Sequence, residues 1–319
     1  MPAGAGGRWL CAVLVFCVLM IFFWLTGALG NSESGPIALF FCAILGYIIP
    51  IVHYVTERTE TAFDELVEHL ALDASAVTRL RQGLNSKTTR WLLVNTMLGV
   101  LMWLLQSRLL SGSFQNMLDA ISGRRGDVDF AMAIGPLPVW IFMFCATHAL
   151  VDNARTFRRL AGVVRLDLLD TSPLTPFGRM AVTSTLVVIG SQALFPIMWL
   201  GEDTDPWTSI PGLIGTSVAL LYLFFAAVWP LHQRLRAAKR TELTRLAGEL
   251  RVVRSASQDP AIDSALGSLL VYRREIASAP EWPFDISIVA RFGLYLIIVP
   301  LTWIGAALIE NLVDLFIRA

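Results

Sequence analysis

The chain has 319 residues, of which 55% are hydrophobic and 16% are charged, and its mean hydropathy is +0.62. Soluble domains carry about 25% charged residues, so a chain this apolar needs lipid as part of its solvent. The composition excludes a disordered chain, a collagen and a disulfide-stapled secreted scaffold. Its 25 basic and 25 acidic residues balance, which leaves no overall field to attract nucleic acid. The sequence therefore predicts an all-α, polytopic membrane protein.

Seven apolar stretches are long enough, or nearly so, to cross a bilayer, which takes about 20 residues. The first follows a single basic residue, Arg8. Its apolar core is longer than that of a cleavable signal peptide, so we expect it to be retained as a helix. The seven predicted spans are 9–29, 36–55, 91–109, 130–151, 180–200, 210–230 and 286–316.

Arginine and lysine set the expected orientation, because short cytoplasmic loops carry an excess of both. With the amino terminus inside, 20 of the 25 basic residues fall in cytoplasmic segments and four fall outside. The prediction is a cytoplasmic amino terminus and an external carboxyl terminus. Arginine makes up 23 of the 25 basic residues, which suits a GC-rich genome.

The spans divide the chain into three parts. Residues 1–230 hold the first six spans, with cytoplasmic loops 56–90 and 152–179. Residues 231–285 are predicted to form a cytoplasmic helical hairpin between the sixth and seventh helices, and residues 286–319 hold the seventh.

Both cytoplasmic loops have helical periodicity. In the first, a helix is expected to restart at Asp73. In the second, apolar residues from Phe157 to Leu168 predict an amphipathic helix that breaks at residues 170–173.

The first arm of the hairpin carries apolar residues at steps of three and four, as in a coiled coil. A seam of this kind must be buried by the chain's own segments, by a partner or by copies of the chain, and these arrangements remain open. If copies of the chain bury it, the seam is an oligomer anchor. Its residues are Leu243, Leu246, Leu250 and Val253.

The last span carries residues at helical spacing that could line a narrow, mostly apolar pore closing by dewetting. These are Tyr295, Val299, Thr302, Ala306 and Ile309. Glu310 and Asp314 follow near the external end, where symmetry would make them an acidic ring that concentrates cations at the mouth. The alternative is that these residues only pack helices and that the two acids lie in water.

The sequence contains no enzyme signature, phosphate-binding loop or paired-cysteine motif, so we expect no enzyme, cofactor or metal centre. His148 and Asp152 are four residues apart and share a helix face. A metal site or proton relay would use such a pair. The alternative is an interfacial hydrogen-bonded pair that ends the fourth span.

The predicted topology, with a long sixth helix and a cytoplasmic helix leading back into the last span, resembles the seven-transmembrane ion channel superfamily of insect odorant and gustatory receptors. The resemblance covers the whole chain. It implies a homotetramer held together by cytoplasmic helices, with the last span of each subunit lining a cation pore, and a small-molecule ligand is compatible with it. The motifs at 165–170, 173–177 and 281–285 also look like those of bacterial membrane proteins. This second resemblance implies a bacterial inner (plasma) membrane as the location.

Two other functions stay open. A secondary transporter is expected to show an internal repeat, which the seven unequal spans lack. A non-conducting sensor or scaffold would recruit a cytoplasmic partner. The expected partners are the lipid bilayer and, for the channel, further copies of the chain, and not nucleic acid.

Overall fold

The computed structural model describes residues 5–85, 88–110, 112–200, 210–255 and 260–282, and single positions between 290 and 308. In these ranges the regular elements are all helical, which confirms the predicted fold class. The α-helices are α1 (Ala5–Leu25), α2 (Ser34–Val67), α3 (Ala74–Asn85), α4 (Thr89–Leu110), α5 (Phe114–Ile121), α6 (Asp127–Ile134), α7 (Pro136–Val163), α8 (Thr175–Gln192), α9 (Ile210–Ser255) and α10 (Pro260–Ser278). Three 3₁₀ turns connect them: η1 (Ala28–Gly30), η2 (Ser172–Leu174) and η3 (Phe195–Leu200).

Five helical segments in the described part are long and apolar enough to cross a membrane. They contain most of the second to sixth predicted spans, and the shorter apolar helix Trp9–Leu25 coincides with the first. Most of the seventh, 286–316, lies outside the described residues. The five segments are Ser34–Val67, Ala74–Leu109, Asp127–Val163, Ser172–Met198 and Ser217–Val253.

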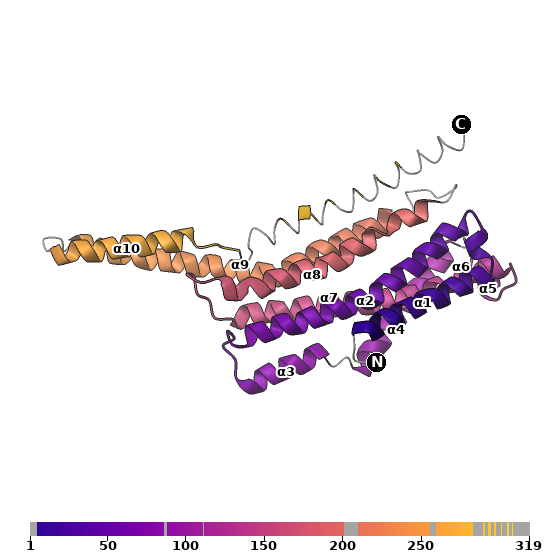
Figure 1. Ribbon diagram of the computed structural model, residues 1–319, viewed down its shortest axis with the longest axis horizontal. Coiled ribbons are helices and arrows are strands. Elements are labelled where there is room, and N and C mark those ends of the chain that lie inside the picture. Colours follow the sequence, from indigo (N-terminus) through magenta and orange to yellow (C-terminus); the bar gives the residue numbers. More distant parts are fainter. Residues whose placement is uncertain are drawn as a thin grey trace.

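The centre of the bundle is formed by α2, α7, α8 and α9 (Figure 1). Helix α2 packs against α1, α7 and α8, while α9 packs against α7 and α8. Helices α1 and α4 lie at the periphery and expose many large apolar side chains, among them Trp24 (70% exposed) and Met97 (72%). Such a surface is the one that a membrane helix presents to lipid.

The bundle has two ends, each with its own apolar core. We call the end that carries residues 67–74 and 163–175 the hairpin end, and the end that carries 26–33 and 121–127 the far end. The hairpin-end core includes Phe63, Leu66, Phe157, Leu160, Phe177 and Leu231. The far-end core includes Phe23, Phe41, Cys42, Ile44 and Ala131.

At the hairpin end, the backbones that follow α2 and α7 pair with each other. Leu70 and Val164 form an isolated antiparallel bridge, and the Ala71 N–H donates to the Val163 carbonyl at 3.0 Å. Val164 is therefore extended, with φ −69° and ψ 140°, and α7 ends at Val163. The predicted amphipathic helix reaching Leu168 is wrong in this respect, because the backbone groups beyond Val163 pair outside the helix. The restart after Asp73 is present as α3.

A two-helix extension projects from the hairpin end. Helix α9 is 46 residues long and continues through Pro230 well past the bundle, and α10 lies along its outer part (Figure 1). These two helices are the two arms of the predicted hairpin.

Candidate functional site

The residues predicted to line a pore lie outside the described residues, and so do both predicted mouth carboxylates. They are Tyr295, Val299, Thr302, Ala306, Ile309, Glu310 and Asp314. Within the same stretch, Leu294, Ile297, Leu301 and Leu308 are helical, and their side chains are 54–64% exposed. At 3.6 residues per turn these four share one face, which lies about 120° around the helix from the predicted pore face. The single chain thus leaves an apolar face open on this helix.

The predicted anchor residues lie on the outer part of α9. Leu246 is completely buried, whereas Leu243, Leu250 and Val253 are partly exposed. Helix α10 runs alongside, and the Tyr272 hydroxyl donates to a Glu242 carboxylate oxygen at 3.2 Å. The seam is therefore covered in part by the chain's own second arm.

Aromatic and charged side chains join the two arms at the base of the hairpin. The Trp282 indole stacks on the His232 imidazole with ring centroids 3.9 Å apart and 13° between the planes. His232 Nδ1 donates to the Glu281 carbonyl at 2.9 Å, because a carbonyl oxygen only accepts. The Glu281 carboxylate lies 3.8 Å from Lys239 Nζ, which also donates to the Ala279 carbonyl at 2.8 Å. We call Trp282, His232, Glu281 and Lys239 the junction clamp, since the chain leaves α9 and α10 here toward the last predicted span.

The most extensive polar site within the described bundle lies between α4 and α7. Four polar contacts and one glycine follow a single stripe of α4, at positions 91, 95, 99, 103 and 106. The indole of Trp103 donates to the Ala133 carbonyl at 2.6 Å, and the indole of Trp140 donates to the Gln106 side chain. At Gly99 the helices come so close that a Cβ atom would lie 2.7 Å from the Ile141 Cα. We call this stripe and its partners the α4–α7 seam.

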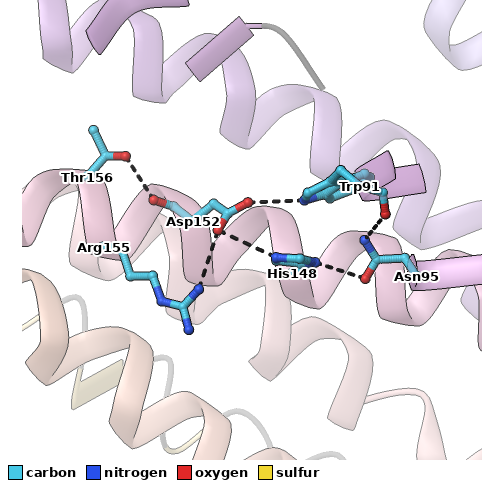
Figure 2. Close-up of polar contacts among 6 residues, drawn as sticks. All are labelled: Trp91, Asn95, His148, Asp152, Arg155 and Thr156. Atoms are coloured by element: carbon cyan, nitrogen blue, oxygen red, sulfur yellow. Dashed lines mark hydrogen bonds and ion pairs between the residues drawn. The ribbon is translucent and has the colours of Figure 1, made fainter. Parts of the chain in front are cut away.

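The hairpin end of the seam holds a chain of polar groups around Asp152 (Figure 2). The Trp91 indole donates to Asp152 Oδ2 at 3.1 Å, and Arg155 lies 3.6 Å from Oδ1. His148 Nε2 is also 3.6 Å from Oδ1, and the His148 ring lies against that of Trp91 with centroids 5.2 Å apart. The Asn95 side chain closes the network at 3.0 Å from His148 Nδ1.

The hydrogen-bond chemistry of Asn95 determines how the imidazole is held. Its amide nitrogen donates to the Trp91 carbonyl at 2.8 Å, so its oxygen faces His148 Nδ1 and must accept the proton on that nitrogen. The other ring nitrogen, Nε2, is left toward the Asp152 carboxylate. Asn95 itself is 1% exposed, so both of its polar atoms are satisfied inside the seam. The arrangement orients an imidazole and a carboxylate at the edge of the apolar region.

Sequence reasoning found part of this site. It paired His148 with Asp152, which do lie side by side, as an interfacial hydrogen-bonded pair or as part of a metal or proton site. It missed Trp91 and Gln106 as partners of α7, and Trp103 as a partner of Ala133 on α6. The stripe positions 91, 95, 99, 103 and 106 are spaced by four, four, four and three residues, and this helical spacing could have revealed the stripe. In the described ranges, no three His, Cys, Asp or Glu side chains gather as metal ligands.

Outside the apolar spans, two exposed aspartates stabilise the hairpin-end turns. The Ser75 hydroxyl donates to Asp73 just before α3 and lowers the pKa of that carboxyl. Ser172 does the same for Asp170 through its hydroxyl and its backbone N–H, again lowering the pKa. Both are local turn interactions and lie apart from the seam.

No protein family, curated protein or solved structure matches the chain.

Proposed function

We propose that the protein is a homo-oligomeric cation channel of a bacterial inner membrane, with seven spans, a hairpin that holds subunits together and a last helix that lines the pore. The observation that supports it best is the hairpin itself. It projects beyond the bundle, yet Leu270 and Val271 on α10 are 48% and 59% exposed (Figure 1).

The length of α9 supports placing these side chains in water. At 1.5 Å per residue, 46 residues extend for about 70 Å, more than twice the roughly 30 Å thickness of a bilayer core. Burying an exposed leucine or valine contributes about 1.5–3 kcal/mol. Copies of the hairpin that pack around an axis would bury Leu270 and Val271. The stabilisation from this burial increases with each subunit that joins.

The distribution of charge supports the proposed orientation. The described arginines at the far end are Arg108, Arg124 and Arg125, whereas the hairpin end carries most of the others. Under the positive-inside rule the hairpin end then faces the cytoplasm and the carboxyl terminus faces out.

The last helix provides the second surface that an oligomer needs. The open face formed by Leu294, Ile297, Leu301 and Leu308 would contact a neighbouring subunit, while the face of Tyr295 and Thr302 lines the pore. Glu310 and Asp314 then ring its outer mouth, as proposed from the sequence. A cation path on the axis follows from the resemblance in topology.

Two measurements on the full-length protein test the proposal. The mass in detergent should be that of an oligomer, expected to be a tetramer, and reconstituted vesicles should pass cations faster than empty ones. Replacing Leu270 and Val271 together by glutamate should lower the mass to that of the monomer. The matched control, Arg273→Glu on the same helix, changes charge without removing an apolar contact and should leave the mass unchanged.

A second pair of variants separates assembly from conduction. Glu310→Gln with Asp314→Asn should lower cation flux while the oligomeric mass stays the same. A monomeric protein that passes no ions under any ligand or voltage contradicts the proposal. A monomer that instead binds a cytoplasmic partner in a one-to-one ratio identifies the scaffold function.

A further inference from the structure

Helix α7 changes character along its exposed side at the level of Asp152. Toward the far end its exposed surface includes Phe142, which is 41% exposed. Past Asp152 it presents Arg155, Arg158 and Arg159, all exposed. The Trp91–Asp152 bond places the beginning of α4 at this level, so α7 runs about 16 Å further, from Asp152 to Val163.

The cations at this end differ in whether a carboxylate neutralises them. Arg179 pairs with Glu65 at 3.0 Å, and Arg81 pairs with Asp64. Across the described ranges, no carboxylate lies at ion-pair distance from Arg158 or Arg159. Two adjacent arginines without a counter-ion repel each other, and an anion held between them removes that cost.

An apolar surface begins at the level of Asp152, about two turns of α7 before Arg158 and Arg159. Helix α4 begins at Thr89, and immediately after Trp91 it exposes Leu92 (53%) and Leu93 (59%), followed by Met97 (72%). Trp91 has the amphipathic ring that is enriched at membrane–water interfaces. An apolar surface directly adjoining a cationic one is complementary to a lipid, whose chains continue from a charged headgroup.

We infer that Arg158 and Arg159, with Arg155 beside them, bind the phosphate of an acidic phospholipid whose acyl chains lie along the exposed side of α4. Guanidinium groups hold phosphate through paired N–H donors, which suits two arginines better than a diffuse positive surface. The lipid would cover an α4 that is otherwise attached chiefly through the α4–α7 seam. This inference is independent of conduction and of subunit number.

The test uses the full-length protein in a neutral detergent, titrated with phosphatidylglycerol, with bound lipid counted by native mass spectrometry. Arg158→Gln with Arg159→Gln should weaken binding about 30-fold, since each arginine near an anionic surface contributes about 1 kcal/mol and 1.4 kcal/mol is a factor of ten. The matched control is Arg124→Gln with Arg125→Gln, an adjacent pair of exposed arginines at the far end that already have Asp119 and Asp129 as partners. This control should bind as the wild type does.

The inference is overturned by an unchanged affinity in the Arg158/Arg159 glutamine variant, by an equal loss in the Arg124/Arg125 control, or by equal binding of phosphatidylcholine. Replacing Arg158 and Arg159 by lysine keeps the charge but removes the paired guanidinium donors, so it should weaken binding less than the glutamine change does. This comparison separates headgroup recognition from misfolding. Inorganic phosphate should compete weakly. If it displaces the lipid at equal concentration, the site recognises free phosphate and the lipid inference is wrong.

Discussion

At the scale of single residues, the α4–α7 seam depends on a few side chains that satisfy one another away from water. Asn95 is the most buried of them, and it contacts both the Trp91 carbonyl and His148. In lipid, apolar helices gain little from associating by hydrophobicity alone, so close packing and interhelical hydrogen bonds hold them together. The seam uses both devices, the bonds of Asn95 and the close approach at Gly99.

Replacing Asn95 by leucine should destabilise the protein by about 0.6–1.7 kcal/mol, the range measured for hydrogen bonds between membrane helices. The reason is that His148 Nδ1 loses the Asn95 oxygen, its partner across the seam, and that the Trp91 carbonyl loses the second donor that the Asn95 side chain supplies. Unfolding in mixed micelles measures the change. Thr147→Val, at an exposed position of α7, is the control, and an equal effect of both changes would contradict the role assigned to Asn95.

Replacing Gly99 by alanine should separate α4 from α7 and cost about 1–3 kcal/mol, because the new Cβ would meet the backbone of Ile141 at 2.7 Å. Gly248→Ala is the matched control, since nothing lies within 4 Å of its Cβ position in α9. That change should be neutral or stabilise by about 0.5–1 kcal/mol. Thermal unfolding in detergent distinguishes the two, and a stabilising Gly99→Ala would show that the helices are not in close contact.

At the scale of elements, the two arms of the hairpin are joined at its base by the junction clamp. Stacking of His232 on Trp282 and the bonds to Glu281 and Ala279 hold the carboxyl end of α10 against α9. A movement at the base of the hairpin therefore also moves Glu281 and Trp282, which directly precede the last predicted span. In an oligomeric channel, this would connect subunit contacts to the pore helix.

Removing the clamp's indole tests this connection. Trp282→Ala should make the amides of the last two turns of α10 exchange with solvent about two- to tenfold faster, since an aromatic pair contributes about 0.5–1.5 kcal/mol. Hydrogen–deuterium exchange on the full-length protein measures this. Trp24→Ala, on the exposed side of α1, should leave these amides unchanged. An equal rate in the Trp282 variant and the wild type would mean that the stack does not hold α10.

At the scale of the whole molecule, the structure separates a lipid-sized bundle from a projecting hairpin, and charge decides which side each end faces. A cysteine placed at Arg240 or Arg274, both exposed on the hairpin, should react with a membrane-impermeant maleimide only after the cells are opened. A cysteine placed at Arg124 should react from outside. The reverse pattern would invert the orientation and move the carboxyl terminus to the cytoplasm.

The sequence by itself determined the features that depend on local composition. Helix length and hydropathy must match the bilayer thickness, so the five helical segments long and apolar enough to cross a membrane, and the first apolar helix, were found close to where they lie. The restart of α3 and the two arms of the hairpin could be predicted from periodicity, because periodicity is a property of the local sequence. His148 and Asp152 could be paired because they lie on one helix.

Only the tertiary structure decided which helices meet. Helix α7 ends at Val163 because Val164 pairs with Leu70, a residue more than 90 positions away in the chain, and no local pattern encodes that pairing. The same holds for the contacts that Trp91 and Asn95 make with α7. It also holds for the stacking of Trp282 on His232. These groups become neighbours only after the helices assemble. Hydrophobicity favours insertion of a helix into lipid but hardly determines which helix it packs against, because lipid and another apolar helix are similar solvents for it.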